Sequence, residues 1–532
     1  MGAPLYAAGQ RKGAAVQKRL PEIPFAALIT SDAPIAANAH GGRAKCLQRL
    51  VRLDLPVPCT VALSFDAVRG IAEGQMPELA TILGEFPDDA LLCVRPSSED
   101  PDWGGPGAVL NVGMNDARYV DLCDSMGAQA AAALYLRFVQ SYAVHVARLD
   151  PDVFDAVSED GPEALGLILQ AYEAETDEAF PQDRGEQLAA VLRSMARAWD
   201  GTTARLLRQA KGAPVDAGLG LVVQEMVPGL GQGECGSGVL QLINSQTGKP
   251  QITGRYLSQS QGRDALGAGA AALYLEQDPR GPALADVAPA AFADLKSHAA
   301  LMRQRLREAM QVEFVIENGH VHILDGVRVA RSARAAVRIA VALAEDGIIS
   351  PQEAVMRIDA HSLNELLHRQ VDPLATREVI GTGIAASPGA ATGRLVFTAA
   401  EAQASASRRE PCILVRRETS PEDIRGMHAA VAVLTEKGGI TSHAAVIGRG
   451  LGLPCIVGAS SLKFLSKEKQ LVTTEGRVFK AGDIVTIDGS SGEVLAGQPA
   501  MLEAALDDAF QTLMGWADAE RDIGIRANAD TP

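Results

Sequence analysis

Hydrophobic and polar positions follow two different periods along the chain, and each change of period marks a boundary between predicted elements. Apolar residues recur at helical spacing from Leu47 to Leu55, and the Leu-Pro-Val-Pro element there ends the predicted helix. The same period runs through residues 127–210 and predicts a helical subdomain. Short apolar runs bounded by glycine or polar turns predict strands at 91–100, 219–227, 237–244 and 251–257.

The segment 312–329, VEFVIENGHVHILDGVRV, predicts a β-hairpin. Two alternating runs flank Asn318 and Gly319, and an Asn-Gly pair supplies the positive φ angles that tight hairpin turns need. Beyond this hairpin, a mixed strand and helix pattern extends from Gly381 to about Leu495. Helices are predicted at 332–346, 351–369 and 501–524.

The order of these elements predicts an α/β protein of several domains. At roughly 100–200 residues per domain, 532 residues suggest three or four. The expected divisions are a lead-in at 1–32, a domain with a helical insertion at 33–330, a helical linker at 331–380, a mixed β/α domain at 381–500, and a connector helix at 501–532.

Bulk composition fits a globular protein and narrows the expected partners. Hydrophobic residues make up 47% of the chain and charged residues 21%, as in ordinary folded proteins. The net charge of −16 and the lack of a long basic run disfavour a nucleic-acid partner. No apolar run is long enough for a membrane span, and the N-terminus lacks the apolar segment of a secretory signal. Seven cysteines without a CxxC pair suit a reducing compartment, so a cytoplasmic location is expected.

The residues around His443 are suited to carrying a phosphoryl group. A neutral imidazole nitrogen is a nucleophile that forms transient covalent intermediates. Gly439 lets the backbone approach closely, while Thr441 and Ser442 can cap the helix that begins at His443 and donate to phosphoryl oxygens. The helix N-terminus adds N–H donors and partial positive charge, and Arg449 adds a full charge. Taken alone, the same pattern also suits a helix-capping turn with an incidental histidine.

Longer stretches around this histidine resemble a known family. GGITSHAAVIGRGLGLPCIVG, preceded by GTGIAASPGAATGRLVF and ETSPEDIRGMHAA, resembles the phosphohistidine domain of the pyruvate, phosphate dikinase family of PEP-utilising enzymes. The resemblance implies that residues 381–500 form a swivelling domain and that His443 is its catalytic residue. It further implies that Gly439, Thr441, Ser442 and Arg449 stabilise the phosphoryl group.

Residues 33–330 resemble the ATP-grasp domain of the same family. HGGRAKCLQRL, VRPSSED and VEFVIENGHVHILDG occur in the family's order. The resemblance implies ATP as substrate and Mg²⁺ as cofactor. It also implies Arg43, Arg95, Glu313 and Asp325 as nucleotide-binding residues, with Glu313 as the metal ligand.

Several positions depart from the family pattern in this half. Arg43 stands where the family has a lysine, Gln311 where it has a carboxylate, and Asp325 where it has a glutamine. Arg255 and Arg263 replace two glutamates. Catalysis of this type depends on cations that neutralise triphosphate charge, so these changes favour an alternative hypothesis. In that alternative the chain is a degenerate phosphocarrier or regulatory protein with a non-functional ATP site.

The family's third part, a barrel that binds pyruvate or phosphoenolpyruvate, is represented only by the segment around Arg526. A barrel typically takes about 250 residues, so we expect this acceptor domain to be lost or to reside on a separate protein. The preferred hypothesis is therefore a dikinase-like phosphotransferase, incomplete alone, that passes a phosphoryl group from ATP through His443. An inactive remnant and a homodimer are left open.

Overall fold

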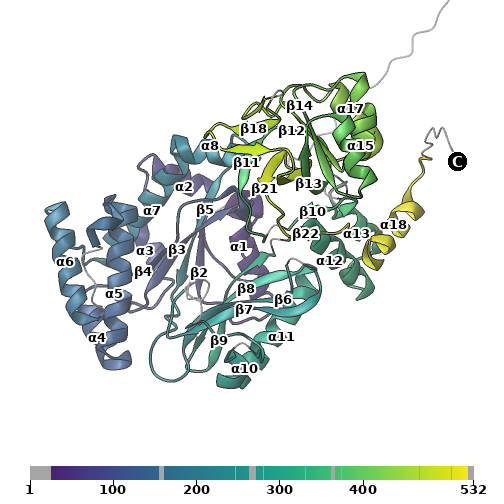
Figure 1. The fold of residues 1–532 in the computed structure, drawn as a ribbon. Helices are drawn as coiled ribbons and strands as arrows, with labels where there is room; N and C mark the ends of the chain where they lie inside the picture. Colours follow the sequence, from purple (N-terminus) through teal and green to yellow (C-terminus); the bar gives the residue numbers. More distant parts are fainter. Residues whose placement is uncertain are drawn as a thin grey trace, which may run out of the picture. The chain divides into compact units, whose positions relative to one another are not determined.

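In the computed structural model the protein consists of two compact units (Figure 1). The first comprises residues 1–242 and 252–329, and the second comprises residues 243–251 and 330–532. Arg263 and Arg526, which the sequence analysis singled out, lie outside the described residues. The described residues are 25–154, 161–245, 247–262, 271–279, 281–329, 331–360, 363, 366–372, 374–465, 468–504 and 506–524.

A five-stranded antiparallel sheet forms one part of the first unit, with the strand order β1-β2-β5-β3-β4. Arg95 on β3 pairs with Val222 on β5, and Ser98 pairs with Leu219 at the start of β5. The strands are β1 (Ala26–Leu28), β2 (Thr60–Leu63), β3 (Leu92–Ser98), β4 (Val109–Val112) and β5 (Leu219–Glu225).

The second sheet of this unit has the order β7-β6-β8-β9. The predicted hairpin is confirmed: Asn318 and Gly319 connect β8 to β9 with φ angles of 51° and 79°, as a tight primed turn requires. Glu313 and Asp325 are direct cross-strand partners in this hairpin. The strands are β6 (Gly236–Ile243), β7 (Pro250–Ser258), β8 (Met310–Glu317) and β9 (His320–Arg328).

Helices surround these sheets, and the predicted helical subdomain is confirmed. Helices α4, α5 and α6 lie side by side at one end of the unit (Figure 1), where Tyr135, Phe138 and Phe180 are buried in edge-to-face contact. The helices are α1 (Ala37–Val51), α2 (Phe65–Ala72), α3 (Leu79–Leu83), α4 (Asp116–Met126), α5 (Ala128–Tyr142), α6 (Pro162–Thr176), α7 (Arg184–Asp200), α8 (Thr202–Ala210), α10 (Leu284–Val287) and α11 (Pro289–Leu306).

The second unit contains an eight-stranded mixed sheet with the order β11-β21-β20-β13-β14-β15-β16-β12. Strands β13, β14, β15 and β16 run parallel to one another, and the other pairs are antiparallel. The strands are β11 (Val379–Thr382), β12 (Ile384–Ser387), β13 (Ala390–Val396), β14 (Cys412–Arg416), β15 (Ala432–Thr435), β16 (Cys455–Val457), β20 (Ile484–Asp488) and β21 (Glu493–Ala496).

Helices connect the parallel strands, so this part of the unit is a series of β-α-β crossovers. Helix α15 (Ala399–Ser407) joins β13 to β14, α16 (Ile424–Ala429) joins β14 to β15, and α17 (His443–Leu451) joins β15 to β16. A small antiparallel sheet of β17 (Leu462–Leu465), β18 (Gln470–Thr473) and β19 (Val478–Lys480) follows.

A helical group completes the second unit. Helices α12 (Ala333–Glu345), α13 (Pro351–Met356) and α18 (Asp508–Glu520) pack together, and Arg338 Nε lies 2.7 Å from Asp507 Oδ2 at the start of α18.

Two predicted helices of this unit differ in extent from the structure. The helix predicted at 351–369 is interrupted at 357–359, because α13 ends at Met356 and the described residues 360, 363 and 366 are helical again. The helix predicted at 501–524 begins at Asp508, because β22 (Met501–Leu502) pairs with β10 (Gln370–Val371) and is extended there. A local period cannot reveal such a long-range pairing.

Across the described part of the chain, no helix combines the length and the apolar character needed to cross a lipid bilayer.

Candidate functional site

His443 lies at the carboxyl end of the parallel strands of the second unit. Strand β15 ends at Thr435, a loop follows, and α17 begins at His443. The loop after the neighbouring strand β14 runs beside it, because Glu436 and Lys437 donate backbone hydrogen bonds to the carbonyls of Arg416 and Arg417, at 3.1 and 2.9 Å. The carboxyl ends of parallel strands are where open α/β sheets place their ligands.

Ser442 is the N-cap of α17, as the sequence predicts. Its backbone is extended, with φ −65° and ψ 159°, and its Oγ accepts the N–H of Ala445 at 3.4 Å. The first intrahelical hydrogen bond joins Val446 N to the Ser442 carbonyl, so the N–H groups of His443 and Ala444 precede it. The imidazole therefore sits at the positive end of a helix, and its side chain is exposed while Ala444 and Ala445 are buried beneath it.

Gly438 allows the loop before His443 to turn sharply. Its φ is 117°, and the carbonyl of Gly438 lies 2.7 Å from where a Cβ of Gly458 would be. Gly439 accepts the N–H of Ser442 at 2.9 Å, and Thr441 is exposed next to the histidine. Two glycines thus bring the loop against the end of β16, where a side chain would prevent close approach.

Arg449 holds the same loop through two carbonyl groups. Its Nη1 donates to the carbonyl of Ala386 on β12 at 3.0 Å, and its Nη2 donates to that of Ile440 at 2.8 Å. In this arrangement the guanidinium ties the loop to the sheet. Sequence reasoning missed the role of Ala386, because a backbone carbonyl leaves no trace in a residue pattern.

The loop after β14 is held by Asp423, at the start of α16. Its Oδ2 accepts from the backbone N of Ser420 at 2.9 Å, from Ser420 Oγ at 3.2 Å and from Arg416 Nε at 3.1 Å. The carboxylate is buried and satisfied, so its role in this loop is structural.

Cys455 lies under α17 without contributing a nucleophile. Burial raises the pKa of its thiol to about 12, and its Sγ lies 3.7 Å from the carbonyl oxygen of Ala444. A thiol that is protonated and buried packs the helix onto β16 and is chemically inert at neutral pH.

The four residues predicted to bind a nucleotide meet in the first unit, where they form one ion-pair cluster. Arg43 on α1 donates from Nε to Asp325 Oδ2 at 2.6 Å. Arg95 on β3 donates from Nη2 to Glu313 Oε2 at 2.6 Å and to Asp325 Oδ2 at 3.3 Å. The Glu313–Asp325 pairing in the hairpin brings both carboxylates to the same place.

This cluster is buried and neutral. The side chain of Asp325 is fully buried, and those of Arg95 and Glu313 are 10% and 9% exposed. Burial alone would raise the pKa of Asp325, but the charges of Arg43 and Arg95 outweigh burial and hold the pKa below its ordinary value. Conversely, the two carboxylates raise the pKa of Arg95 despite its burial. Two cations therefore face two anions, and little positive charge is left over for a ligand.

A cavity of about 280 Å³ adjoins the cluster and is lined in part by Arg43, Cys46, Pro96 and Asp325. Burial, followed by the charge of Asp325, raises the pKa of Cys46 to about 12, and its Sγ donates to the Gly326 carbonyl at 2.9 Å. This thiol is therefore protonated at neutral pH.

Ser97 fixes the glycine pair at the start of α1, a role that sequence reasoning missed. Its Oγ donates to the His40 carbonyl at 2.7 Å and accepts the N–H of Ala44 at 3.1 Å. Gly41 has φ 86°, and a Cβ there would lie 1.8 Å from the Ser97 carbonyl oxygen. The matched VRPSSED segment was the available signal, because Ser97 lies within it.

The residues present do not fit Mg²⁺ in this arrangement. Gln311, at the position where a second carboxylate was expected, accepts from Gln241 Nε2 at 2.7 Å. Glu313 is paired with Arg95, and within the described residues no group of three or more His, Cys, Asp or Glu side chains could hold a metal. Mg²⁺ prefers several oxygen ligands in octahedral geometry.

Arg255, one of the departures noted in the sequence, has a structural role. Its guanidinium lies 4.1 Å from the ring centroid of Tyr274, and its Nη1 donates to the Ala272 carbonyl at 3.1 Å. The side chain therefore anchors residues 271–274 against β7.

Comparison with known proteins identifies relatives across both units. The mobile domain of PEP-utilising enzymes matches residues 408–492, which include His443. Over 92% of its length the chain is 35% identical to a pyruvate, phosphate dikinase from Rhizobium meliloti, and over 93% it is 33% identical to one from Clostridium symbiosum. A chloroplastic pyruvate, phosphate dikinase from Flaveria pringlei is 31% identical over 92% of the chain.

The chain spans only part of these relatives. It covers 59% of the Rhizobium protein, 60% of the Clostridium protein and 55% of the Flaveria protein. The similarity includes both the ion-pair cluster of the first unit and the histidine loop of the second.

Proposed function

Because the chain belongs to the pyruvate, phosphate dikinase family, we propose that it is a phosphotransferase that carries a phosphoryl group on His443. The observation that carries this proposal is the position of the imidazole, exposed at the N-terminus of a helix that Ser442 caps. A helix N-terminus stabilises the negative charge that phosphorylation adds. The relatives are pyruvate, phosphate dikinases and the matched domain is that of PEP-utilising enzymes, which supports phosphotransfer that involves pyruvate or phosphoenolpyruvate.

In the proposed step, a ring nitrogen of neutral His443 attacks the phosphorus of a donor. The new P–N bond forms as the donor P–O bond breaks, and the leaving oxygen takes the electron pair. The N–H groups at the start of α17 and the hydroxyls of Thr441 and Ser442 are the donors available to the phosphoryl oxygens. In the second half of the cycle an acceptor oxygen attacks phosphorus and the P–N bond breaks.

The first candidate donor is ATP, with pyruvate or phosphoenolpyruvate bound by a barrel on a separate protein. ATP as donor is supported by the similarity to pyruvate, phosphate dikinases. It is also supported by the four predicted nucleotide-binding residues, which meet in one place: Arg43, Arg95, Glu313 and Asp325. Because these residues do not fit Mg²⁺ as they are arranged, we assign no step to the metal. ATP loading would require the two arginines to exchange their carboxylate partners for phosphates.

The second candidate is a carrier that is loaded by a partner and does not use ATP. The specific observation that favours it is the neutral ion-pair cluster, in which each arginine already has a carboxylate partner. A triphosphate needs surplus positive charge, and losing one such stabilising group commonly costs about 10²–10³ in rate.

The test is labelling of the purified full chain with radioactive phosphorus. The protein is incubated with ATP labelled at the β or the γ phosphorus and Mg²⁺, or with labelled phosphoenolpyruvate and a barrel-containing partner. Acid-labile, base-stable label that disappears in His443→Ala and persists in His428→Ala is expected. His428 is an exposed histidine on α16 and serves as the matched control.

The outcomes separate the candidates. Label from ATP alone supports the first, and label only from phosphoenolpyruvate with the partner supports the second. If the second holds, the triple variant Arg43→Lys, Gln311→Asp, Asp325→Gln, which removes three of the noted departures from the family pattern, should gain labelling from ATP. Absence of label at His443 from every donor would overturn the proposed function.

A further inference from the structure

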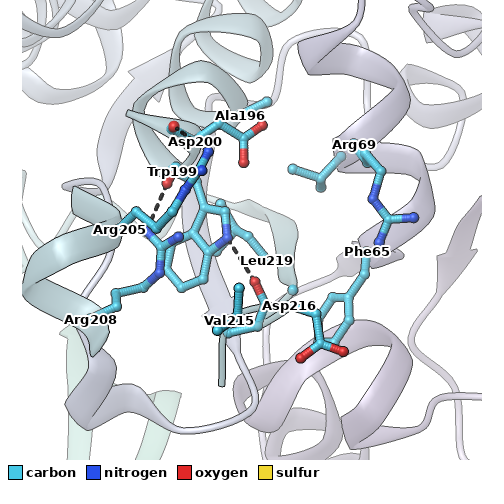
Figure 2. A pocket seen from close by; sticks show the side chains of 13 residues that line it. Phe65, Arg69, Ala196, Trp199, Asp200, Arg205, Arg208, Val215, Asp216 and Leu219 are labelled. Atoms are coloured by element: carbon cyan, nitrogen blue, oxygen red, sulfur yellow. Dashed lines mark hydrogen bonds between the residues drawn. The ribbon is translucent and has the colours of Figure 1, made fainter. Parts of the chain in front are cut away.

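A second cavity of the first unit, on the side of α2 and α8, is not used by the proposed phosphotransfer. Its volume is about 320 Å³. Figure 2 shows Phe65 and Arg69 of α2 on one side and Trp199 with Arg208 on the other. The loop before β5, ending at Gly218, closes the cavity between them.

One wall is a preformed stack of Trp199 and Arg208. The guanidinium carbon lies 3.6 Å from the indole centroid, and Nη1 donates to the Trp199 carbonyl at 2.7 Å. The indole Nε1 in turn donates to the Ala217 carbonyl at 3.1 Å (Figure 2). Trp199 is 5% exposed and Arg208 6%, so both groups are held in a fixed orientation.

Arg208 is unusual for its helix. Among the α8 side chains that the structure describes it is the buried one, whereas Leu206 and Leu207 on the same helix are 61% and 60% exposed. An amphipathic helix ordinarily buries its leucines and exposes its arginines. Burying a guanidinium over an indole instead indicates that this position is selected for a planar cation at the cavity wall.

Three arginines and two aspartates contribute the charge of the cavity. Arg69 and Arg205 are exposed, and among the described residues their polar contacts are with Asp66 and with the carbonyl of Asp200. Asp200 and Asp216 are exposed at the same rim. In a chain with net charge −16, the side chains that line the cavity carry one net positive charge, which Asp66 offsets through its pair with Arg69.

The opposite wall is aromatic. Gly218 permits this, because a Cβ there would lie 2.3 Å from Cδ2 of Phe65. Glycine at this position lets the Phe65 ring stand against the loop, so the cavity has a ring on one side and a guanidinium–indole stack on the other. Flat walls of this kind accept a planar ligand ring.

We propose that this cavity binds a nucleoside monophosphate. The base would stack against the aromatic and guanidinium walls, Arg69 and Arg205 would bind the phosphate, and the exposed carboxylates of Asp200 and Asp216 would accept the ribose hydroxyls. A volume near the lower end of the roughly 300–1,000 Å³ range of small-molecule sites suits one mononucleotide.

The cavity is separate from the ion-pair cluster but shares a wall with the cavity beside it. Cζ3 of Trp199 lies 3.8 Å from where a Cβ of Gly105 would be, and Gly105 lines the cavity next to Arg43 and Asp325. A ligand that orders the Trp199 indole would therefore act on a residue that lies beside both cavities. The experiment must show in which of the two cavities the nucleotide is held.

The test follows the fluorescence of Trp199. The chain has three tryptophans, so Trp103→Phe and Trp516→Phe leave Trp199 as the reporter. The full chain is titrated with adenosine 5′-monophosphate, with inorganic phosphate and adenosine as separate arms. We expect saturable quenching by the monophosphate, weakened about tenfold by Arg69→Gln or by Arg205→Gln.

Two controls locate the ligand. Arg197→Gln, at an exposed arginine on α7 outside the cavity, should leave the affinity unchanged, and so should Arg328→Gln, at an exposed arginine that lines the cavity beside Arg43. Loss of binding in Arg328→Gln but not in Arg69→Gln would overturn the proposal by placing the nucleotide in the other cavity. Quenching by inorganic phosphate at equal affinity, or no saturation by the monophosphate at millimolar concentration, would overturn it as well.

Discussion

Arg43 and Asp325 form an ion pair, Nε to Oδ2 at 2.6 Å, although 282 residues separate them in the chain. The resemblance noted in the sequence implies a lysine and a glutamine at these two positions, so the two departures meet in a single contact. Here the cation has its own counter-ion, which explains why the cluster is neutral without a ligand.

Removing the Asp325 carboxylate should destabilise the first unit strongly. Its side chain is fully buried between Arg43 and Arg95, and its loss leaves two guanidiniums with one carboxylate. We expect Asp325→Ala to lower the free energy of unfolding by about 3–5 kcal/mol, as is typical when one member of a buried ion pair is removed. Urea denaturation measures this change. Asp66→Ala removes a pair whose side chains are 73% and 62% exposed, and should have no measurable effect.

The same carboxylate should make stability depend on acid pH. The neighbouring arginines hold the pKa of Asp325 below its unfolded value of about 3.9, so ionised Asp325 stabilises the fold above that pH. This contribution is lost as the pH falls through the folded pKa. The difference in unfolding free energy between wild type and Asp325→Asn should be constant near neutrality and shrink below about pH 4. A difference that grows toward acid would contradict the ion pair.

Local signals predicted the elements that carry these contacts. The Asn318-Gly319 turn and the Ser442 cap each depend on a few adjacent residues, and both were found from sequence. The ion pair of Arg43 with Asp325 depends on the register of β8 against β9 and on where α1 meets the sheet. A linear pattern of residues does not contain such long-range geometry. The sequence therefore predicted which four residues belong to the site, but it did not predict that their charges neutralise one another.

Long-range pairing also explains why the helix predicted at 501–524 begins later than expected. The apolar period at 501–524 is genuine, but Leu502 pairs with Gln370 across more than a hundred residues and extends the chain there. The helix then begins after Asp507, whose side chain accepts the N–H of Phe510. A cap of this kind is a stronger signal for a helix start than the apolar period.

Ser442 should have a structural role in addition to its chemical one, whereas Thr441 should have the chemical role without the structural one. Ser442 Oγ caps α17, whereas Thr441 is exposed beside His443. We expect Ser442→Ala to lower the unfolding free energy by about 1 kcal/mol. Thr441→Ala should leave stability unchanged and slow the phosphorylation of His443. Thermal unfolding and labelling of each variant measure the two effects, and equal destabilisation by both would contradict the assignment.

A lysine in place of Arg449 should keep the positive charge but not the function of the arginine. Its guanidinium spans two carbonyl oxygens, of Ala386 at 3.0 Å and of Ile440 at 2.8 Å, and a single ammonium lacks that planar fork. In Arg449→Lys we expect faster amide hydrogen exchange at Gly438 to Thr441 and roughly tenfold slower labelling of His443, because one charge-assisted hydrogen bond is lost. Arg425→Lys, an exposed arginine on α16, is the matched control and should change neither. Slower labelling in Arg449→Lys with unchanged exchange would mean that the guanidinium contacts the phosphoryl group directly.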